Sequence, residues 1–176
     1  YGLLPISRSE PYDMLEIIER LVDDSSFEQY KEGYGKTLLT GYARIDGWAV
    51  GIVANQPRVK AGCLDVNASD KAARFIRFCD AFNIPLINFV DVPGYFPGVT
   101  QEHAGIIRHG AKNLHGYSHL TNPKVTLVLR RSYGGSNIVM GCSNMVPDLM
   151  YGSPTAIFVS TGTESIVQSV YHKELE

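Results

Sequence analysis

Apolar residues follow two patterns along the chain. In some segments they recur at helical spacing, and in others they form short continuous runs. Apolar residues recur at helical spacing over 14–22 and over 72–82, which predicts two amphipathic helices. Short runs rich in β-branched and aliphatic residues cover 85–90, 124–129 and 155–159, as is typical of buried strands. Strands that alternate with helices in this way predict an α/β fold with parallel strands and crossover helices.

A β-hairpin is expected in the first third of the chain. Residues 37–45 and 48–55 have the composition of strands, and Asp46-Gly47 between them is a strong two-residue turn signal. Either Asn67 or Ser69 can then cap the helix that follows the hairpin.

A long helix is predicted from Thr100, which can cap it, to about Ser118. Glycines at 105, 110 and 116 weaken this helix by about 1 kcal/mol each relative to alanine. Repeated glycine in a helix indicates that a neighbouring backbone or a ligand packs closely on it. Further along, residues 147–154 are expected to form a loop.

The stretch 130–140 is the strongest candidate for a functional site. It places Gly134 and Gly135 between the strand at 124–129 and a weakly helical segment. Paired glycines let a ligand approach the backbone closely, and the free N–H groups of a helix start favour negative charge. The turn is therefore a candidate oxyanion hole or anion cradle. Taken alone, it is equally compatible with a tight turn whose glycines serve only backbone geometry.

Composition and charge narrow the class of protein. The 176 residues are 44% hydrophobic and 19% charged, with a net charge of −2, as in ordinary globular domains. Without a basic tail or a charge run, nucleic acid and membrane surfaces are not expected partners. No apolar stretch reaches the ~20 residues of a membrane span. Tyr1 in place of an initiator Met suggests a fragment boundary. Residues 1–10, with Pro5, Ser7 and Ser9 and no periodicity, are interpreted as a linker or fragment start, and 11–176 as one domain.

Several common chemistries lack their sequence signatures. Cys63, Cys79 and Cys142 are widely spaced, without a C-x-x-C, and are expected to be small buried residues in a reducing compartment. The histidines between 103 and 119 have no carboxylate or cysteine at zinc-site spacing, so no metal is expected. Dinucleotide, P-loop and nucleophile-elbow glycine motifs are absent from the sequence. A serine or cysteine hydrolase is disfavoured because no His–carboxylate pair is evident from spacing.

Longer stretches of the sequence are similar to one known family. The matching segments run nearly end to end and comprise 12–13 with the helix that follows, 34–45, 50–57, 71–85, 89–98, 105–112 and 132–135. Together they resemble the C-terminal half of the carboxyltransferase (β) subunit of biotin-dependent acyl-CoA carboxylases, the propionyl-CoA and methylcrotonyl-CoA carboxylase family. The most specific segment is 89–98, with two prolines and two glycines around Tyr95 and Phe96.

The resemblance implies a crotonase-like ββα spiral fold and an active site shared between domains. In this family the N-terminal carboxyltransferase domain of one subunit supplies most of the acyl-CoA site, and the C-terminal domain of another receives carboxybiotin. Biotin is carried by a separate biotin-carrier or biotin-carboxylase subunit. The implied reaction transfers CO2 to the α-carbon of an acyl-CoA, while backbone N–H groups stabilise the biotin enolate.

Further expectations follow from the same resemblance. The protein is expected to be a homo-oligomer without a metal, in the cytoplasm or, in a eukaryote, the mitochondrial matrix. Two alternatives remain: a biotin-dependent decarboxylase or transcarboxylase of the same fold, and a degenerate, non-catalytic assembly module.

Individual roles are carried over by position within the matching stretches. Gly135 and Ser136 match the pair whose backbone N–H groups face the biotin ureido oxygen, and Gly134 gives them room. Residues assigned to the acyl substrate are Asn137, Ile138 and Gly162. Residues assigned to the biotin pocket are Asp91, Pro93, Gly94, Tyr95 and Phe96, together with Gly134.

Three departures from the family pattern gather near one end of this site. The usual Gly-Gly-Ala is Gly-Gly-Ser at 134–136, which preserves a backbone donor. Ser153-Pro154 replaces a Trp-Pro, and 162–166 is bulkier and more charged than the small-residue helix start of the family. These changes are compatible with an unusual acyl substrate or with a degenerate paralogue.

Overall fold

The computed structural model describes residues 2–7, 9–160 and 163–175. A seven-stranded sheet in the order β1-β2-β3-β4-β5-β6, with β7 beside β5, forms its centre. The strands are β1 Glu28–Gln29, β2 Leu38–Ile45, β3 Trp48–Asn55, β4 Leu86–Val92, β5 Lys124–Tyr133, β6 Leu149–Gly152 and β7 Ile157–Val159. The helices are α1 Met14–Leu21, α2 Val66–Ala81, α3 Val99–His103, α4 Ile106–His119, α5 Gly134–Val139 and α6 Thr163–Leu175, with short 3-10 helices η1 Lys60–Gly62 and η2 Ser143–Met145.

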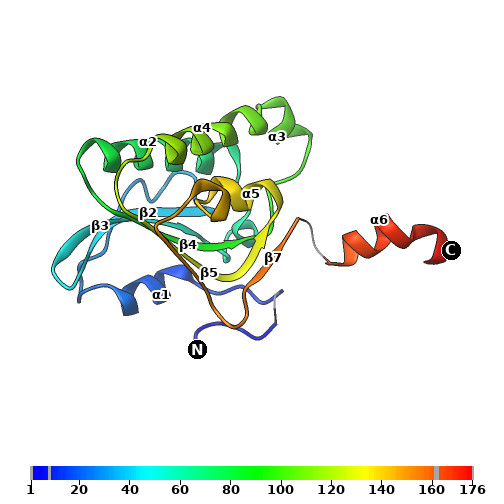
Figure 1. Ribbon diagram of the computed structural model, residues 1–176, viewed down its shortest axis with the longest axis horizontal. Helices are drawn as coiled ribbons and strands as arrows, with labels where there is room; N and C mark the ends of the chain where they lie inside the picture. Colours follow the sequence, from blue (N-terminus) through cyan, green and yellow to red (C-terminus); the bar gives the residue numbers. More distant parts are fainter. Residues whose placement is uncertain (1, 8, 161–162, 176) are drawn as a thin grey trace.

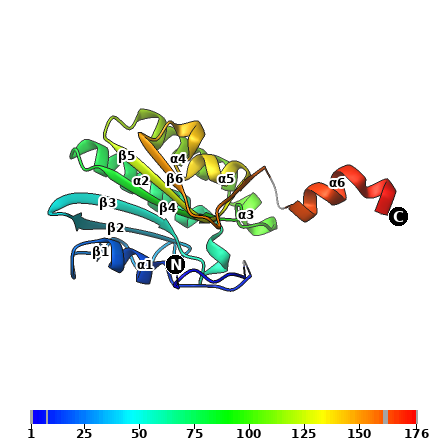
Figure 2. The ribbon, with the colours of Figure 1, turned by 60° about the horizontal axis from the view of Figure 1, so that its bottom comes forward.

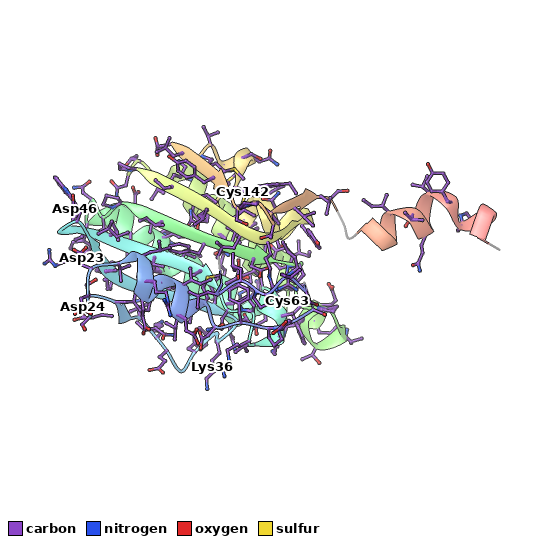
Figure 3. All side chains as sticks on the ribbon, turned by 90° about the horizontal axis from the view of Figure 1, so that it is seen from below. Asp23, Asp24, Lys36, Asp46, Cys63 and Cys142 are labelled. Carbon is purple, nitrogen blue, oxygen red and sulfur yellow. The ribbon has the colours of Figure 1, made fainter. Side chains whose placement is uncertain are left out.

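The sheet is antiparallel at one edge and parallel elsewhere. Strands β1, β2 and β3 pair antiparallel, whereas β3 to β6 pair parallel and β7 runs parallel to β5. The turn residues Asp46 and Gly47 have φ of 51° and 79°, and their N–H groups donate to the carboxylate of Asp23. Figure 3 shows Asp23 and Asp46 at the same end of the domain. The predicted hairpin and the predicted parallel strands are both confirmed.

Helices cover both faces of the sheet. Figures 1 and 2 show α2 and α4 side by side on one face and α1 on the other, with α6 apart from the sheet. The core accordingly has two buried clusters, one containing Phe75 and Ile76 of α2 and the other Met14 and Ile18 of α1. The predicted apolar stripe of α2 is buried at Ala72, Phe75, Ile76 and Cys79, whereas Phe82, just beyond the helix, is 64% exposed.

Several local predictions are wrong. Thr100 does not cap a helix, because α3 begins at Val99 after Gly98. Asp65, not Asn67 or Ser69, caps α2 by accepting the N–H of Ala68. The helix expected from Thr100 to Ser118 is divided at Gly105, whose φ of 80° is left-handed; glycine adopts that conformation without the steric cost that other residues pay. The predicted loop at 147–154 contains strand β6. The strand was not predicted because four residues between two prolines are too few to show an alternating apolar pattern.

The cysteines lie apart, and the prediction that all three are buried is wrong for Cys63. Cys63 is half-buried, Cys79 and Cys142 are buried, and all three are free thiols; Figure 3 shows Cys63 and Cys142 well separated. None of the helices in the described part of the chain is both long and apolar enough to cross a bilayer.

Candidate functional site

The glycine turn connects β5 directly to α5. Strand β5 continues to Tyr133, four residues beyond the predicted strand, so α5 begins at the next residue. Gly134 has a φ of 57°, and a Cβ there would lie 3.0 Å from the carbonyl oxygen of Ser160. A side chain at 134 would therefore be strained by the backbone conformation and crowded by the Ser160 carbonyl.

The first turn of α5 presents backbone donors. Gly135 is exposed and Ser136 is buried, and the Ser136 hydroxyl donates to the carbonyl oxygen of Tyr133 at 2.7 Å. No side chain caps this helix start, and the N–H groups of Gly135 and Ser136 have no acceptor among the described residues. Unpaired donors at a helix start can bind an oxyanion, as the sequence predicted for this turn.

Tyr95 connects the loop after β4 to this turn. A Cβ on Gly135 would lie 4.0 Å from Tyr95 Cε2, and a Cβ on Gly110 of α4 would collide with the Tyr95 hydroxyl and ring. Tyr95 therefore packs against the backbone of α4 and α5. Close packing is confirmed at Gly110, where the neighbour is a side chain and not the predicted backbone or ligand. Burial raises the pKa of Tyr95 to about 12, so its hydroxyl is a neutral donor at physiological pH.

The rest of the loop is anchored to the segment around η1. Leu64 donates its N–H to the carbonyl oxygen of Gly94 and accepts the N–H of Phe96. The Lys60 ammonium lies 4.4 Å from the centre of the Phe96 ring. Pro93, Gly94, Tyr95 and Phe96 are all partly exposed, so a ligand beside Gly135 can reach this part of the loop.

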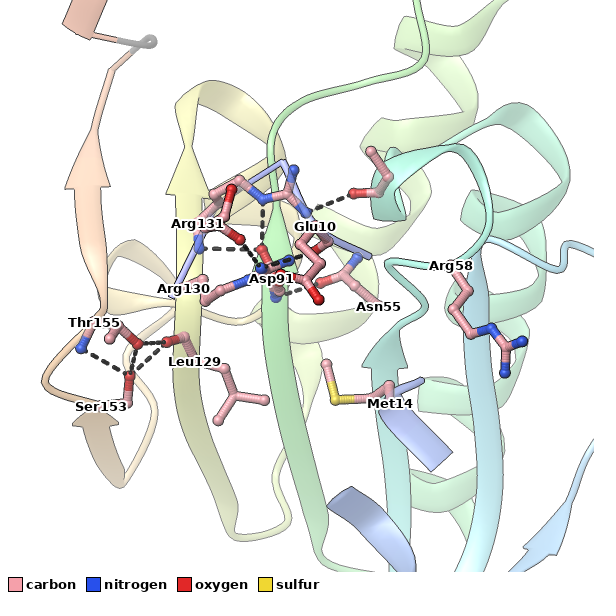
Figure 4. Close-up of polar contacts among 12 residues, drawn as sticks. Glu10, Met14, Asn55, Arg58, Asp91, Leu129, Arg130, Arg131, Ser153 and Thr155 are labelled. Atoms are coloured by element: carbon pink, nitrogen blue, oxygen red, sulfur yellow. Dashed lines mark hydrogen bonds and ion pairs between the residues drawn. The ribbon is translucent and has the colours of Figure 1, made fainter. Parts of the chain in front are cut away.

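Asp91 occupies a different position from the other predicted pocket residues. Its side chain is fully buried and forms ion pairs with Arg130 Nε at 2.9 Å and Arg131 Nε at 2.7 Å (Figure 4). Its backbone N–H donates to Asn55 Oδ1. An aspartate enclosed in this way does not face a ligand, so its part in any pocket is to position the residues around it.

The two arginines extend this buried cluster to distant segments. Arg130 also donates to the carbonyl oxygens of Ser7 and Glu10, and Arg131 donates to that of Ala61. The ends of β4 and β5 are thereby fixed to η1 and to the segment before α1. Both arginines lie in the candidate stretch 130–140, but the sequence predicted no role for them. The available signal was two adjacent cations after one buried strand and an aspartate at the end of another.

Residues assigned to the acyl substrate are only partly placed. Ile138 and Asn137 lie on α5 and are partly exposed, and the buried Oδ1 atom of Asn137 has no partner among the described residues. Gly162 lies outside the described residues.

The Ser153-Pro154 departure has a local structural role. The hydroxyl groups of Ser153 and Thr155 both donate to the carbonyl oxygen of Leu129 (Figure 4). The Ser153 N–H donates to the carbonyl oxygen of Val128. These bonds hold the segment between β6 and β7 against β5, which leads into the glycine turn. No group of three or more potential metal ligands occurs within residues 2–7, 9–160 and 163–175.

The sequence matches the carboxyl transferase domain family over residues 1–176. It is 49% identical over 174 residues to the methylmalonyl-CoA carboxyltransferase 12S subunit of Propionibacterium freudenreichii, covering 99% of this chain and 33% of that protein. It is 49% identical over 173 residues to the methylmalonyl-CoA decarboxylase subunit alpha of Veillonella parvula, with 98% and 34% covered. It is 47% identical over 176 residues to the mitochondrial propionyl-CoA carboxylase beta chain of Homo sapiens, with 99% and 33% covered.

Solved structures give the same result for the fold. The transcarboxylase 12S crystal structure, a hexamer assembly with methylmalonyl-coenzyme A bound, superposes with a TM-score of 0.96 at 49% identity, covering 98% of this chain and 33% of that one. The beta subunit of P. aeruginosa geranyl-CoA carboxylase gives a TM-score of 0.91 at 29% identity, with 99% and 33% covered. The predicted crotonase-like α/β fold is thereby confirmed. The chain spans about a third of the length of these relatives.

Proposed function

The chain belongs to the carboxyl transferase domain family, and from that premise we propose that it forms the carboxybiotin side of an active site for carboxyl transfer to an acyl-CoA. The observation that carries this proposal is the first turn of α5, where the N–H groups of Gly135 and Ser136 have no acceptor among the described residues. These donors would stabilise the negative charge that develops on the biotin ureido oxygen. Each donor of this kind is worth ~3 kcal/mol of barrier.

The residues around the turn are compatible with biotin. Gly135 is exposed and carries no side chain, so a flat ureido ring can approach its N–H. Tyr95 would form one wall of the pocket, and Pro93, Gly94 and Phe96 would continue it. The buried ion pairs of Asp91 hold the start of this loop in place. Biotin, when bound in carboxylated form, supplies the carboxyl group; the protein supplies the donors and the enclosing surface.

The acyl side of the site would begin at α5. Ile138 and Asn137 follow the donor residues by one or two positions, so their side chains would border the substrate, with Gly162 as the third predicted contact. The size of the residue at 138 would then influence which acyl group is accepted. We assign the rest of the acyl-CoA site to an N-terminal carboxyltransferase domain, as the family resemblance implies.

The proposed partners follow from the same assignment. Biotin would arrive on a biotin-carrier or biotin-carboxylase subunit, and the protein would act as a homo-oligomer, as the hexamer assembly of the 12S relative suggests. A cytoplasmic or mitochondrial location is proposed from relatives such as the mitochondrial beta chain.

Three relatives of similar identity are named for three different reactions: a carboxyltransferase, a decarboxylase subunit and a carboxylase beta chain. The direction of carboxyl transfer therefore has to be measured. The test is to assay the assembled enzyme with biotin, comparing methylmalonyl- and malonyl-CoA with propionyl- and acetyl-CoA. A carboxylase converts propionyl- or acetyl-CoA only when biotin is carboxylated, and a decarboxylase releases CO2 from the carboxylated esters. A transcarboxylase needs a carboxylated ester as donor and a second acyl group as acceptor of the carboxyl group. Absence of biotin-dependent turnover with every ester would favour a non-catalytic assembly module and contradict the proposal.

A further inference from the structure

A strongly basic groove lies on the outer surface of the helical layer. It has a volume of about 930 Å³ and is formed by α2, α4 and the segment that precedes β2. Its described lining contains five of the 16 lysines and arginines, namely Lys31, Arg74, Arg77, Arg108 and Lys112, but only one of the 18 carboxylates, that of Asp70. The chain as a whole is slightly acidic, so this concentration of positive charge is local.

Most of these cations are not neutralised by the protein. Asp70 Oδ1 is already shared by Lys112 Nζ at 2.6 Å and His109 Nδ1 at 2.8 Å. Arg74 and Arg77 form no ion pair within the described part of the chain. A bound anion would find both guanidinium groups available, and guanidinium groups match phosphate geometry with two parallel hydrogen bonds.

The spacing of the cations along α2 and α4 destabilises each helix when no anion is bound. Arg74 and Arg77 are three residues apart on α2, and Arg108 and Lys112 are four residues apart on α4. Like charges at these spacings lie on the same helix face and repel each other. The two helices pack side by side (Figure 1), so the four charges also face one groove. An anion with more than one negative charge would relieve this repulsion.

The groove also offers an aromatic surface. Phe78 of α2 is 44% exposed and Tyr34 is 39% exposed, and both line the groove. Inorganic phosphate would leave most of the volume empty, whereas 300–1,000 Å³ is the usual range for organic ligands. A purine base stacks well on an exposed aromatic ring.

We propose that the groove between α2 and α4 binds a nucleotide that carries two or more phosphate groups. The phosphates lie between Arg74, Arg77, Arg108 and Lys112, and the base lies against Phe78. A free nucleoside diphosphate and the nucleotide end of coenzyme A share this chemistry. The inference does not depend on the proposed carboxyl transfer, because the groove residues are not those of the glycine turn.

Calorimetric titration of the whole chain with four probes tests the proposal. ADP and adenosine 3′,5′-bisphosphate are expected to bind, more weakly as ionic strength rises. Tripolyphosphate is expected to bind more weakly than ADP, and adenosine not to bind. A preference for ADP over the bisphosphate identifies a free diphosphate nucleotide as the ligand, and the reverse preference identifies the coenzyme A end. Absence of binding by both nucleotides overturns the proposal.

A pair of double variants makes the test specific for the groove. Arg74→Gln/Arg77→Gln removes two cations that have no described ion-pair partner, and it should weaken ADP binding at least about tenfold. Arg20→Gln/Lys36→Gln removes the same charge at exposed positions outside the groove and should leave binding unchanged. Equal affinities of the two variants, or tighter binding of a poly-glutamate peptide than of ADP, would contradict a nucleotide site, the latter in favour of an acidic protein partner.

Discussion

Gly134 and Gly135 are adjacent residues that are constrained for different reasons. Gly134 has a left-handed backbone and a close carbonyl neighbour, whereas a Cβ on Gly135 would meet only the Tyr95 ring at an ordinary contact distance of 4.0 Å. The fold therefore requires glycine at 134 but tolerates alanine at 135. If Gly135 is indispensable, the reason lies in a ligand and not in the protein.

This difference predicts opposite effects on stability. Gly134→Ala should lower the free energy of unfolding by about 1–2 kcal/mol, because alanine is strained at this φ. Gly135→Ala should leave it unchanged or raise it by up to about 1 kcal/mol, because alanine favours a helix. Urea unfolding of the two variants measures both values, and equal destabilisation by the two substitutions would refute the distinction.

Lys71 predicts a pH dependence. Burial, and secondarily the nearby Lys31, lower the pKa of Lys71 to about 8, and its ammonium donates to the carbonyl oxygens of Tyr34 and Leu38. An unfolded lysine titrates near ~10.4, so between these values the unfolded chain binds more protons and the contribution of Lys71 to stability rises with pH.

The measurement is the difference in unfolding free energy between wild type and Lys71→Met. From about pH 7 to about pH 10 this difference should increase in favour of wild type by on the order of 1–3 kcal/mol. The Met side chain also leaves the carbonyl oxygens of Tyr34 and Leu38 without a donor. Because the free-energy cost of this loss does not depend on pH, the pH slope alone reports the titration of Lys71. Parallel stability curves for the two proteins would show that Lys71 titrates normally.

At the scale of elements, α4 and the loop after β4 are coupled through Tyr95. Gly110→Ala places a methyl group in the space of the Tyr95 ring, so it should lower the free energy of unfolding by about 1–3 kcal/mol. Gly116→Ala is the matched control on the same helix, since its Cβ would lie 3.4 Å from Ile76 Cγ2. The control should be neutral or stabilising by up to about 1 kcal/mol. Thermal or urea unfolding measures the free energy of unfolding of both variants. Similar values for Gly110→Ala and Gly116→Ala would mean that the Tyr95 ring moves aside at little cost.

The ends of β4 and β5 are coupled through Asp91. Asp91→Asn leaves Arg130 and Arg131 without their buried counter-charge, which should lower the free energy of unfolding by about 3–5 kcal/mol. Asp70→Asn is the control, because Asp70 pairs with Lys112 at the surface, where such pairs contribute about 0–1 kcal/mol. A loss below about 1 kcal/mol for Asp91→Asn would show that the cluster is not structurally important.

Local chemistry explains which elements the sequence predicted correctly. Asp46-Gly47 is a turn signal carried by two adjacent residues, and the apolar stripe along α2 is a property of one helix. The break at Gly105 was missed because a helical glycine costs only about 1 kcal/mol, which does not decide between a helix and a kink. The ion pairs of Asp91 were missed because they join residues 39 and 40 positions apart, and spacing along one strand carries no information about its neighbour.

The topology of the entire sheet brings the two parts of the candidate site together at the carboxyl ends of β4 and β5. The parallel strands β4 and β5 end beside each other, so the loop that carries Tyr95 and the turn that carries Gly135 become neighbours. The family resemblance predicted both segments from the sequence, and parallel strand order explains why they meet. The basic groove, in contrast, requires the packing of α2 on α4 and could not be predicted from either helix alone.

The proposed carboxyl transfer depends on the N–H of Gly135, which would stabilise an oxyanion. Gly135→Pro removes this donor without breaking a hydrogen bond to any described residue, and proline is tolerated in the first turn of a helix. Gly135→Ala is the matched control, because alanine adds a Cβ as proline does but keeps the backbone N–H. Unfolding curves of both variants should show that each is folded.

The decisive measurement is the ratio of kcat for Gly135→Ala to kcat for Gly135→Pro in biotin-dependent carboxyl transfer by the assembled enzyme. Loss of one oxyanion donor costs about 3 kcal/mol, so the proline variant should be slower than the alanine variant by a factor on the order of 100. Equal rates for the two folded variants would contradict the assignment of the glycine turn as the oxyanion hole.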